Sequence, residues 1–261
     1  MKIVWLSDLH LTLGGQDLLG VDPERRLVMA IDRINRDHAD AAYCVLTGDL
    51  VEAGNEESYR VLKKHLDRLS VPYLPLVGNH DERASFLATL PLPDLVLEGF
   101  VQYRVKTPQG WIICLDTLMP GQSAGVLCKE RLTWLRDALI DVGDESVYLF
   151  MHHPPGPIGS PMQDGEGLTN GDDLLALLAD YSSIRHLFVG HVHRPISGSF
   201  GPVPFTAMRS AAYQAPPPYP PWTWETFQPA NEPPAMGVIL IDGGNTVVHF
   251  CQFGEEEKAA Q

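Results

Sequence analysis

Short apolar runs alternate with amphipathic stretches through the first 80 residues. The runs with the length and the β-branched or aromatic content of buried strands lie at residues 2–7, 42–47 and 73–77. A helix is predicted to begin at Asp22 and Pro23, because a capping aspartate and a proline at the first helical position favour helix initiation. A second helix is predicted at about residues 56–69. This β-α-β-α-β order predicts parallel strands joined by helical crossovers.

The rest of the chain is richer in strand-like runs. They lie at residues 101–106, 111–116, 147–151, 186–189, 203–208, 236–241 and 246–252. Helical patterns near residues 129–140 and 172–178 separate some of them. Two sheets packed face to face with helices outside accommodate these elements. We therefore predict one α/β domain over residues 1–254, followed by an acidic tail at residues 255–261 that we expect to be disordered.

One stretch of this domain, residues 216–234, has an unusual composition, with eight prolines and four aromatic residues. Proline excludes an ordinary helix or a central strand there. The plain interpretation is an irregular surface excursion. The functional interpretation is that about residues 210–235 form a cap over a binding site or an oligomer contact, because dense exposed aromatic residues usually mark an interaction surface. Both interpretations stay open, and so does self-association of the chain.

The formal net charge of -14 limits the partners of the chain. A basic patch for a nucleic-acid backbone is not expected, so a nucleic-acid polymer is disfavoured as a partner. Anionic small molecules would be repelled at long range, and any phosphate chemistry would need local positive charge, which metal ions can supply. The sequence contains neither a membrane-length apolar run nor a secretion signal, so we expect a cytoplasmic protein without membrane contact.

Metal-binding side chains follow five of the predicted strands at the point where each strand ends. In chain order they are Asp8 and His10, then Asp49, then Asn79, then His152, then His191 and His193. The carboxyl ends of strands in an open α/β sheet form its ligand-binding edge, so these side chains should converge. Gly48, Gly78 and Gly190 directly precede three of them, where the backbone must turn sharply or approach a ligand closely.

The type and number of these side chains indicate a pair of metal ions. Imidazole, carboxylate and amide groups without thiolate suit Fe, Mn, Zn or Co. Seven ligands are too many for one ion that keeps an open position. They suit two ions, roughly 3.5–4 Å apart, that share Asp49 as a bridging carboxylate. The other histidines His38, His65 and His249 are interpreted as structural.

These motifs resemble those of the calcineurin-like metallophosphoesterase family. The resemblance spans about residues 3–195 and comprises D-L-H at 8–10, G-D at 48–49, G-N-H-D at 78–81, H-x-P at 152–154 and G-H-V-H at 190–193. The stretch M-H-H-P-P-G-P-I-G-S at 151–160 is most similar to the bacterial cyclic-nucleotide phosphodiesterases and glycerophosphodiesterases. The resemblance implies a four-layer α/β/β/α sandwich of two mixed sheets flanked by helices.

The resemblance also implies the role of each site residue. It gives one metal ion the ligands Asp8, His10, Asp49 and His193, and a second ion the ligands Asp49, Asn79, His152 and His191. His152 fits the H-x-P ligand position better than His153. His80 corresponds to the family's histidine that bonds the phosphate or assists the leaving group, and Asp81 would support it.

One departure from the family distinguishes between substrates. Phosphoprotein phosphatases carry G-D-x-V-D-R-G, whereas residues 48–54 read G-D-L-V-E-A-G and place Ala53 at the arginine position. A phosphomonoester dianion would miss that cation more than a diester monoanion, because arginine makes bidentate contacts with phosphate. Arg83 or Arg194 is weighed as a substitute cation.

The function expected from these residues is hydrolysis of small phosphodiesters, either glycerophosphodiesters or 3′,5′-cyclic nucleotides, by a metal-bound hydroxide. Asp49 and His80 would carry the chemistry. A phosphomonoesterase or phosphoprotein phosphatase is the alternative, ahead of a nuclease or a non-catalytic scaffold. Residues 154–170, 210–214 and 216–234 are candidates for substrate selection, although the first could be a plain loop with Asn170 capping the next helix.

Overall fold

The computed structural model describes residues 1–94 and 96–254, so the expected tail at residues 255–261 lies outside the described residues. Its strands form two mixed sheets. The first sheet has the order β11 (Asn245–Gln252), β10 (Ala235–Asp242), β1 (Lys2–Leu6), β2 (Tyr43–Thr47) and β3 (Tyr73–Leu76). The second has the order β4 (Tyr103–Thr107), β5 (Gly110–Cys114), β6 (Val147–Met151), β7 (Ile184–Val189), β9 (Val203–Ala207) and β8 (Ile196–Phe200).

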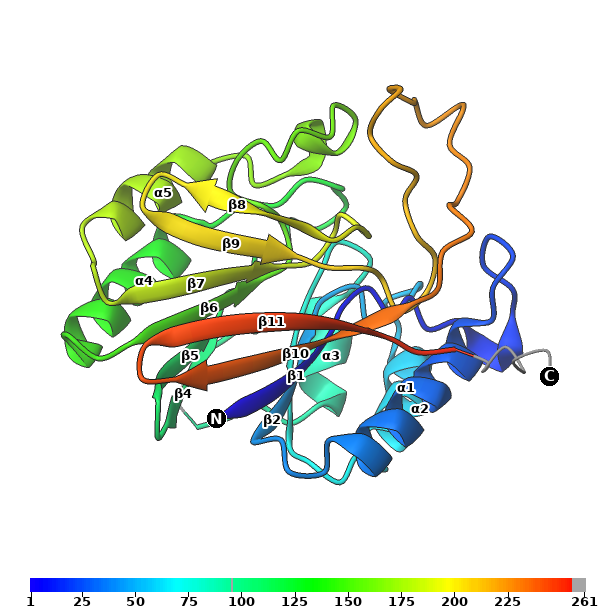
Figure 1. The fold of residues 1–261 in the computed structure, drawn as a ribbon, viewed down its shortest axis with the longest axis horizontal. Coiled ribbons are helices and arrows are strands. Elements are labelled where there is room, and N and C mark those ends of the chain that lie inside the picture. The colour runs from blue at the N-terminus through cyan, green and yellow to red at the C-terminus, as the bar shows by residue number, and fades with distance from the viewer. Residues whose placement is uncertain (95, 255–261) are drawn as a thin grey trace.

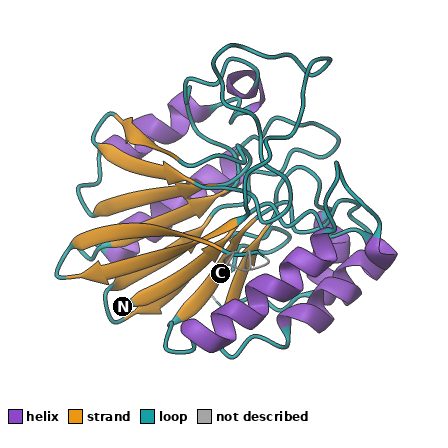
Figure 2. Cartoon of the chain, turned by 45° about the vertical axis from the view of Figure 1, so that its right-hand side comes forward, coloured by secondary structure: helices purple, strands orange, loops and turns teal. Residues whose placement is uncertain are grey.

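Parallel strands occupy the middle of both sheets. In the first sheet β1, β2 and β3 are parallel, and β10 joins β1 in the antiparallel sense. In the second sheet β5, β6, β7 and β9 are parallel, with β4 and β8 antiparallel at the edges. The carboxyl ends of the parallel strands of both sheets therefore point to one side of the molecule, where the loops gather (Figure 2).

Helices cover the outer face of each sheet (Figure 1), which confirms the predicted four-layer α/β/β/α order. The first sheet has α1 (Pro23–Asp37), α2 (Glu56–Leu66) and α3 (Arg83–Thr89), and the second has α4 (Lys129–Val142) and α5 (Gly171–Ala179). Central strands are apolar on both faces for this reason: Phe188 of β7 packs edge-on against Trp5 between the sheets, at 5.3 Å between ring centroids, while Leu187 joins the core under α4 and α5.

Local chemistry explains where the helices begin. The Asp22 carboxylate accepts a hydrogen bond from the Arg25 amide with Pro23 at the first helical position, as predicted for α1. Two elements were not predicted. α3 has seven residues and begins where the Glu82 side chain accepts from two amides. β8 is a largely polar edge strand, I-S-G-S-F, whose hydrophobic pattern is too weak to predict a strand.

The described segment at residues 216–234 contains neither helix nor strand, as its prolines predict, and it projects from the sandwich as the orange loop of Figure 1. A single bridge between Gln214 and Ala230 closes its base. Of the helices in residues 1–94 and 96–254, none has the length and apolar character needed to cross a membrane.

Candidate metal centre

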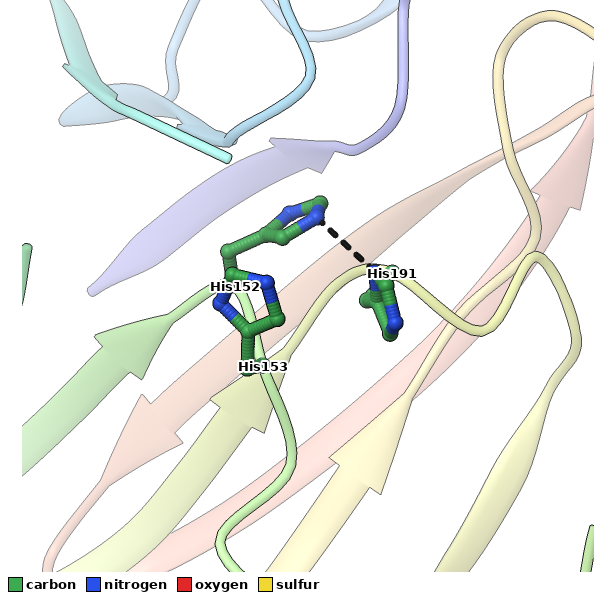
Figure 3. Close-up of side chains that lie close together, drawn as sticks. All are labelled: His152, His153 and His191. Carbon is green, nitrogen blue, oxygen red and sulfur yellow. Dashed lines mark hydrogen bonds between the residues drawn. The ribbon is translucent and has the colours of Figure 1, made fainter. Parts of the chain in front are cut away.

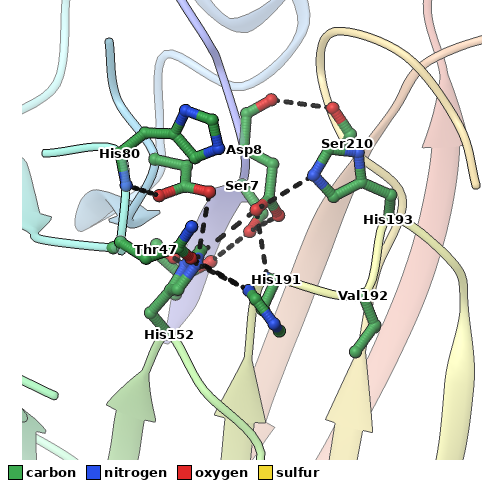
Figure 4. A network of polar contacts seen from close by, with 12 residues as sticks. Ser7, Asp8, Thr47, His80, His152, His191, Val192, His193 and Ser210 are labelled. Carbon is green, nitrogen blue, oxygen red and sulfur yellow. Dashed lines mark hydrogen bonds and ion pairs between the residues drawn. The ribbon is translucent and has the colours of Figure 1, made fainter. Parts of the chain in front are cut away.

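The seven predicted ligands lie together where the two sheets meet, at the carboxyl ends of their parallel strands. Figure 4 labels four of them: Asp8, His152, His191 and His193. Asp8 and His10 follow β1, Asp49 follows β2, Asn79 follows β3, His152 follows β6, and His191 and His193 follow β7. Residues up to 185 positions apart therefore share one site because strands of both sheets end at the same edge.

The first group of side chains surrounds the Asn79 amide oxygen. This Oδ1 lies 3.1 Å from His152 Nε2 and 3.1 Å from His191 Nδ1. The same two ring nitrogens are 3.2 Å from each other (Figure 3). Asp49 Oδ2 completes the group at 3.4 Å from His152 Nε2.

The second group centres on a pair of histidines. His10 Nε2 and His193 Nε2 are 3.2 Å apart. Asp8 Oδ1 lies 3.4 Å from His193 Nε2, and Asp49 Oδ2 lies 3.6 Å from His10 Nε2. Asp49 Oδ2 therefore lies between the two groups, and the division of residues is the one that the family resemblance implies.

Protein acceptors outside the site fix the protonation of three rings. His152 Nδ1 donates to the Thr47 carbonyl at 2.8 Å, His193 Nδ1 to the Tyr213 carbonyl at 2.9 Å, and His10 Nδ1 to Glu52 Oε2 at 2.7 Å. In a neutral ring each Nε2 then presents a lone pair to the site. Two lone pairs 3.2 Å apart, as on His10 and His193, repel each other unless a cation lies between them. The donor set therefore fits metal ions.

Burial and neighbouring charges shift the pKa values of the candidate ligands. Burial alone would raise the pKa of Asp8 and Asp49, but the neighbouring His193 and His152 outweigh it and lower both. Burial would lower the pKa of His152, yet Asp49 and Asp8 raise it to about 9. Burial, reinforced by His152, lowers the pKa of His191 to about 3, so this ring stays neutral as a metal ligand must.

The backbone at these residues adopts a conformation that non-glycine residues seldom take. Within residues 1–94 and 96–254, six non-glycine residues have positive φ, and five of them belong to the predicted ligand set. They are Asp8 at 54°, His10 at 44°, Asp49 at 47°, His191 at 70° and His193 at 50°. Strain of this kind persists only where the surroundings impose it, and it concentrates at functional sites.

All three motif glycines are required by close approach, and at Gly48 an added Cβ would lie 2.6 Å from His152 Nδ1. A Cβ at Gly78 would lie 2.2 Å from Asp49 Oδ1, and a Cβ at Gly190 would lie 2.5 Å from the Thr47 carbonyl oxygen. Any side chain at either position would displace a candidate ligand or the carbonyl that orients His152. The sequence prediction that these glycines allow close approach is confirmed.

His80 lies at the edge of the same site. Its amide donates to Asp49 Oδ1 at 2.9 Å, and its ring nitrogen Nδ1 lies 3.4 Å from Glu52 Oε2. Burial would lower the pKa of His80, but Asp49 and Glu52 raise it. About a third of the side chain is exposed, at 35%, and it lines the pocket over the site.

Asp81 links the loops that carry the site residues through buried hydrogen bonds. Its Oδ2 accepts from the Gly78 amide at 2.8 Å and from the Leu50 amide at 3.1 Å, and its Oδ1 accepts from the Tyr59 hydroxyl at 2.8 Å. The carboxylate therefore connects the loop after β2 to the loop after β3. This is the supporting position that was expected beside His80.

His153 lies next to the site but both of its ring nitrogens have protein partners. Nε2 donates to the Ser123 carbonyl at 3.0 Å, and Nδ1 accepts from the Thr117 hydroxyl at 2.7 Å. Its nitrogen lies within 4.8 Å of donor atoms of His152 and His191, so proximity alone would make it a candidate ligand. The satisfied ring favours His152, as the H-x-P motif does.

Two residues considered from sequence have other partners. Arg83 pairs with Asp116 at 2.7 and 2.9 Å, and Arg194 binds the Ala215 carbonyl at 2.6 Å and Glu232 at 3.1 Å. In the described part of the chain neither lines the pocket, so neither is placed to substitute for the missing arginine.

Asn170 stands at the start of α5 and was considered as its cap. Its side chain instead bonds the backbone of Leu127, at 3.0 and 2.8 Å, and makes no cap hydrogen bond.

Sequence reasoning missed Glu52 and the carbonyl groups that orient the rings. Glu52 stands in the segment that was compared only for the absent arginine, and its contact with His10 spans 42 positions. The acceptors at Thr47 and Tyr213 are backbone atoms, which residue identity does not reveal. The Ser7 hydroxyl, which donates to Asp8, likewise carried no recognisable motif.

A pocket of about 360 Å³ opens over the site. Its inner wall consists of His10, Asp49, Asn79, His80, His191 and His193, and its outer wall of Ser123, Gln163, Glu166, Tyr213 and Trp224. Among the described residues that line it there is no lysine or arginine. The volume is suitable for a small molecule.

Comparisons with known proteins agree with this arrangement. A protein of Rhodopseudomonas palustris named "Probable cyclic nucleotide phosphodiesterase" is 35% identical over 97% of this chain and 93% of its own length. A glycerophosphodiester phosphodiesterase of Enterobacter lignolyticus is 31% identical over 83% of this chain and 79% of its own. A dimetal phosphatase of Danio rerio shares the fold, with a TM-score of 0.73 at 15% identity over 96% of both chains.

The family comparison covers every strand end of the site. The sequence model of the family described as calcineurin-like phosphoesterase matches residues 1–195, which contain all seven predicted ligands and His80. Together with the relative that matches nearly the whole chain, this shows that the protein is a member of the calcineurin-like phosphoesterase family of hydrolases.

Proposed function

We propose that this chain hydrolyses small phosphodiesters with two metal ions, one bound by Asp8, His10, Asp49 and His193, the other by Asp49, Asn79, His152 and His191. The observation that carries the proposal is the 3.2 Å approach of His10 Nε2 and His193 Nε2, both of which give their ring N–H to acceptors outside the site. Nitrogen and oxygen donors without thiolate suit Fe, Mn, Zn or Co. When bound, such ions neutralise charge on the phosphate and activate water as the nucleophile.

The residues of the chain have separate tasks in this proposal. Glu52, Thr47 and Tyr213 orient the rings that hold the ions. His80 is held at the rim by Asp49 and Glu52, whose negative charge raises the pKa of its ring and so favours the protonated form. From there it donates that proton to the departing alkoxide, which is a poor leaving group without it.

The pocket supports a diester in preference to a monoester. A monoester dianion would need a cation beyond the metal ions, whereas Ala53 stands at the family's arginine position. The described lining contains no lysine or arginine, and Arg83 and Arg194 are bound to carboxylates elsewhere. The phosphodiesterases among the relatives support the same choice. A net charge of -14 opposes a nucleic-acid polymer as substrate.

The test combines metal analysis with a substrate comparison on one preparation. We expect two transition-metal ions per chain and faster hydrolysis of bis(p-nitrophenyl) phosphate than of p-nitrophenyl phosphate. Glycerophosphodiesters and 3′,5′-cyclic nucleotides should then be screened with the same protein. Binding of a single ion at saturation, or a preference for the monoester, would contradict the proposal.

A further inference from the structure

The outer wall of the pocket carries a charge of unexpected sign. Glu166, at the end of the short 3₁₀ helix Gln163–Glu166, lines a pocket that must admit a phosphate anion. Arg and Lys are missing from the described lining, so no cation neutralises this carboxylate locally. The net charge of -14 adds repulsion at long range. A substrate with only negative charge is therefore repelled by Glu166 inside the pocket and by the net charge of the chain at long range.

Two aromatic side chains line the same pocket as this carboxylate. They are Tyr213 and Trp224, and Trp224 comes from the segment at residues 216–234. Phe227 continues the wall, with its ring centroid 5.7 Å from that of Trp224 and 6.1 Å from that of Tyr213. Burial raises the pKa of Glu166, and the neighbouring Trp224 acts in the opposite direction. The carboxylate is thus partly buried in a pocket that aromatic rings also line.

We infer that Glu166, Trp224 and Tyr213 form a subsite for an ammonium group carried by one alcohol of the phosphodiester. A carboxylate with aromatic faces is the arrangement that binds organic cations, through ion pairing and cation–π attraction. The preferred substrates are then zwitterionic diesters, whose positive end meets Glu166 while the phosphate meets the inner wall. This inference rests on the proposed function and makes Glu166 a specificity-determining residue for it. Cyclic nucleotides, which lack such a group, become poorer substrates than choline-type diesters.

A purely structural role for Glu166 is the competing explanation. Its contact with Trp224 could serve only to hold the segment at residues 216–234 against the pocket. Glu166→Gln separates the two roles, because glutamine keeps the size of the side chain and an acceptor oxygen toward Trp224 but removes the charge. Asp180→Asn is the matched control, since it changes the net charge equally at an exposed position at the end of α5.

The experiment compares two diesters that differ in one charge. Glycerophosphocholine and its neutral 3,3-dimethylbutyl analogue, in which carbon replaces the ammonium nitrogen, are supplied to metal-loaded protein. Consumption is followed by ³¹P NMR, whichever ester bond breaks. We expect kcat/KM to be about tenfold higher for the cationic diester. Glu166→Gln should reduce that ratio to about one by slowing the cationic diester only, and Asp180→Asn should leave the ratio unchanged.

A binding measurement supplies a second readout that does not depend on turnover. Choline chloride should bind metal-free protein in a calorimetric titration, and Glu166→Gln should weaken that binding about tenfold. Equal consumption of the two diesters by the unsubstituted protein would overturn the inference and leave the proposed function standing. So would an equal loss for both diesters in Glu166→Gln. If neither diester nor any other were consumed, the proposed function would fail and this inference with it.

Discussion

The inner and outer walls of the pocket are built in different ways. The inner wall comes from strand ends of both sheets and consists of buried and partly buried residues, several with left-handed backbone conformations and fixed ring orientations. The outer wall comes from loops and a short 3₁₀ helix, and its most peripheral member, Trp224, is 50% exposed. In the proposed function, the sheets therefore fix the groups that act on phosphate, while the loops select the alcohols attached to it.

The largest effect should follow from a change at the centre of the inner wall. Asp49→Ala removes the carboxylate that both proposed metal positions share, and we expect kcat/KM for a diester to fall by at least about 10³-fold. Metal content measured by mass spectrometry should fall together with activity. An active variant that still holds two ions would show that Asp49 does not bridge them. Asp180→Ala, at an exposed position, is the control.

His80→Ala separates metal binding from proton transfer within the same wall. The variant should lose about 10²–10⁴-fold in kcat, because a positioned proton donor contributes that much. Metal content should stay at the level of the unsubstituted protein, since the hydrogen bond from His80 to Asp49 comes from its backbone amide, which the substitution keeps. Retained kcat would remove His80 from the chemistry, and loss of metal would make it a ligand.

Glu52→Gln tests whether the contacts behind the inner wall matter. Glutamine can still face His10 Nδ1 but no longer accepts from it with a full negative charge. We expect the affinity of the position that contains His10 to fall about 10- to 100-fold, as is usual when the partner of a ligating histidine is changed. Competition with a chelator measures this affinity. Unequal weakening of the two ions is the expected signature, and equal weakening would contradict it.

The smallest effect should come from the outer wall. Trp224→Ala should leave metal content and thermal stability unchanged, because the residue is half exposed in an irregular segment. The rates for different diesters should change by several-fold and by different factors, since only the binding of the alcohol groups is altered. A uniform loss for all substrates, or a fall in the melting temperature, would place Trp224 in the scaffold instead.

The same division explains what the sequence could predict. Asp8, Asp49 and His152 were identified because each stands at the end of an apolar run, and their spacing needs no tertiary information. α3 and β8 were missed because one is short and the other largely polar, so their hydrophobic patterns are weak. The outer wall had no motif, but four of its five residues lie in the segments 154–170, 210–214 and 216–234 that the sequence analysis named as candidates for substrate selection.

Long-range partners were the least predictable feature. The pairing of Arg83 with Asp116 joins residues 33 positions apart and depends on how α3 lies over the loop after β5. Asn170 has the right residue type and position for a helix cap, yet tertiary bonds to Leu127 take its side chain. A local preference gives way when a distant backbone offers two hydrogen bonds at once.

The left-handed residues at the inner wall have a consequence for how the protein is assembled. Each non-glycine residue in that conformation costs about 1–2 kcal/mol, so five of them together oppose folding by an amount similar to the net stability of a whole domain. The turns that carry these residues are therefore strained, and a less strained backbone conformation is favoured unless other contacts hold them. Metal ions bound by these turns would offset the strain and so stabilise the folded chain. The same binding step would complete the proposed catalytic site.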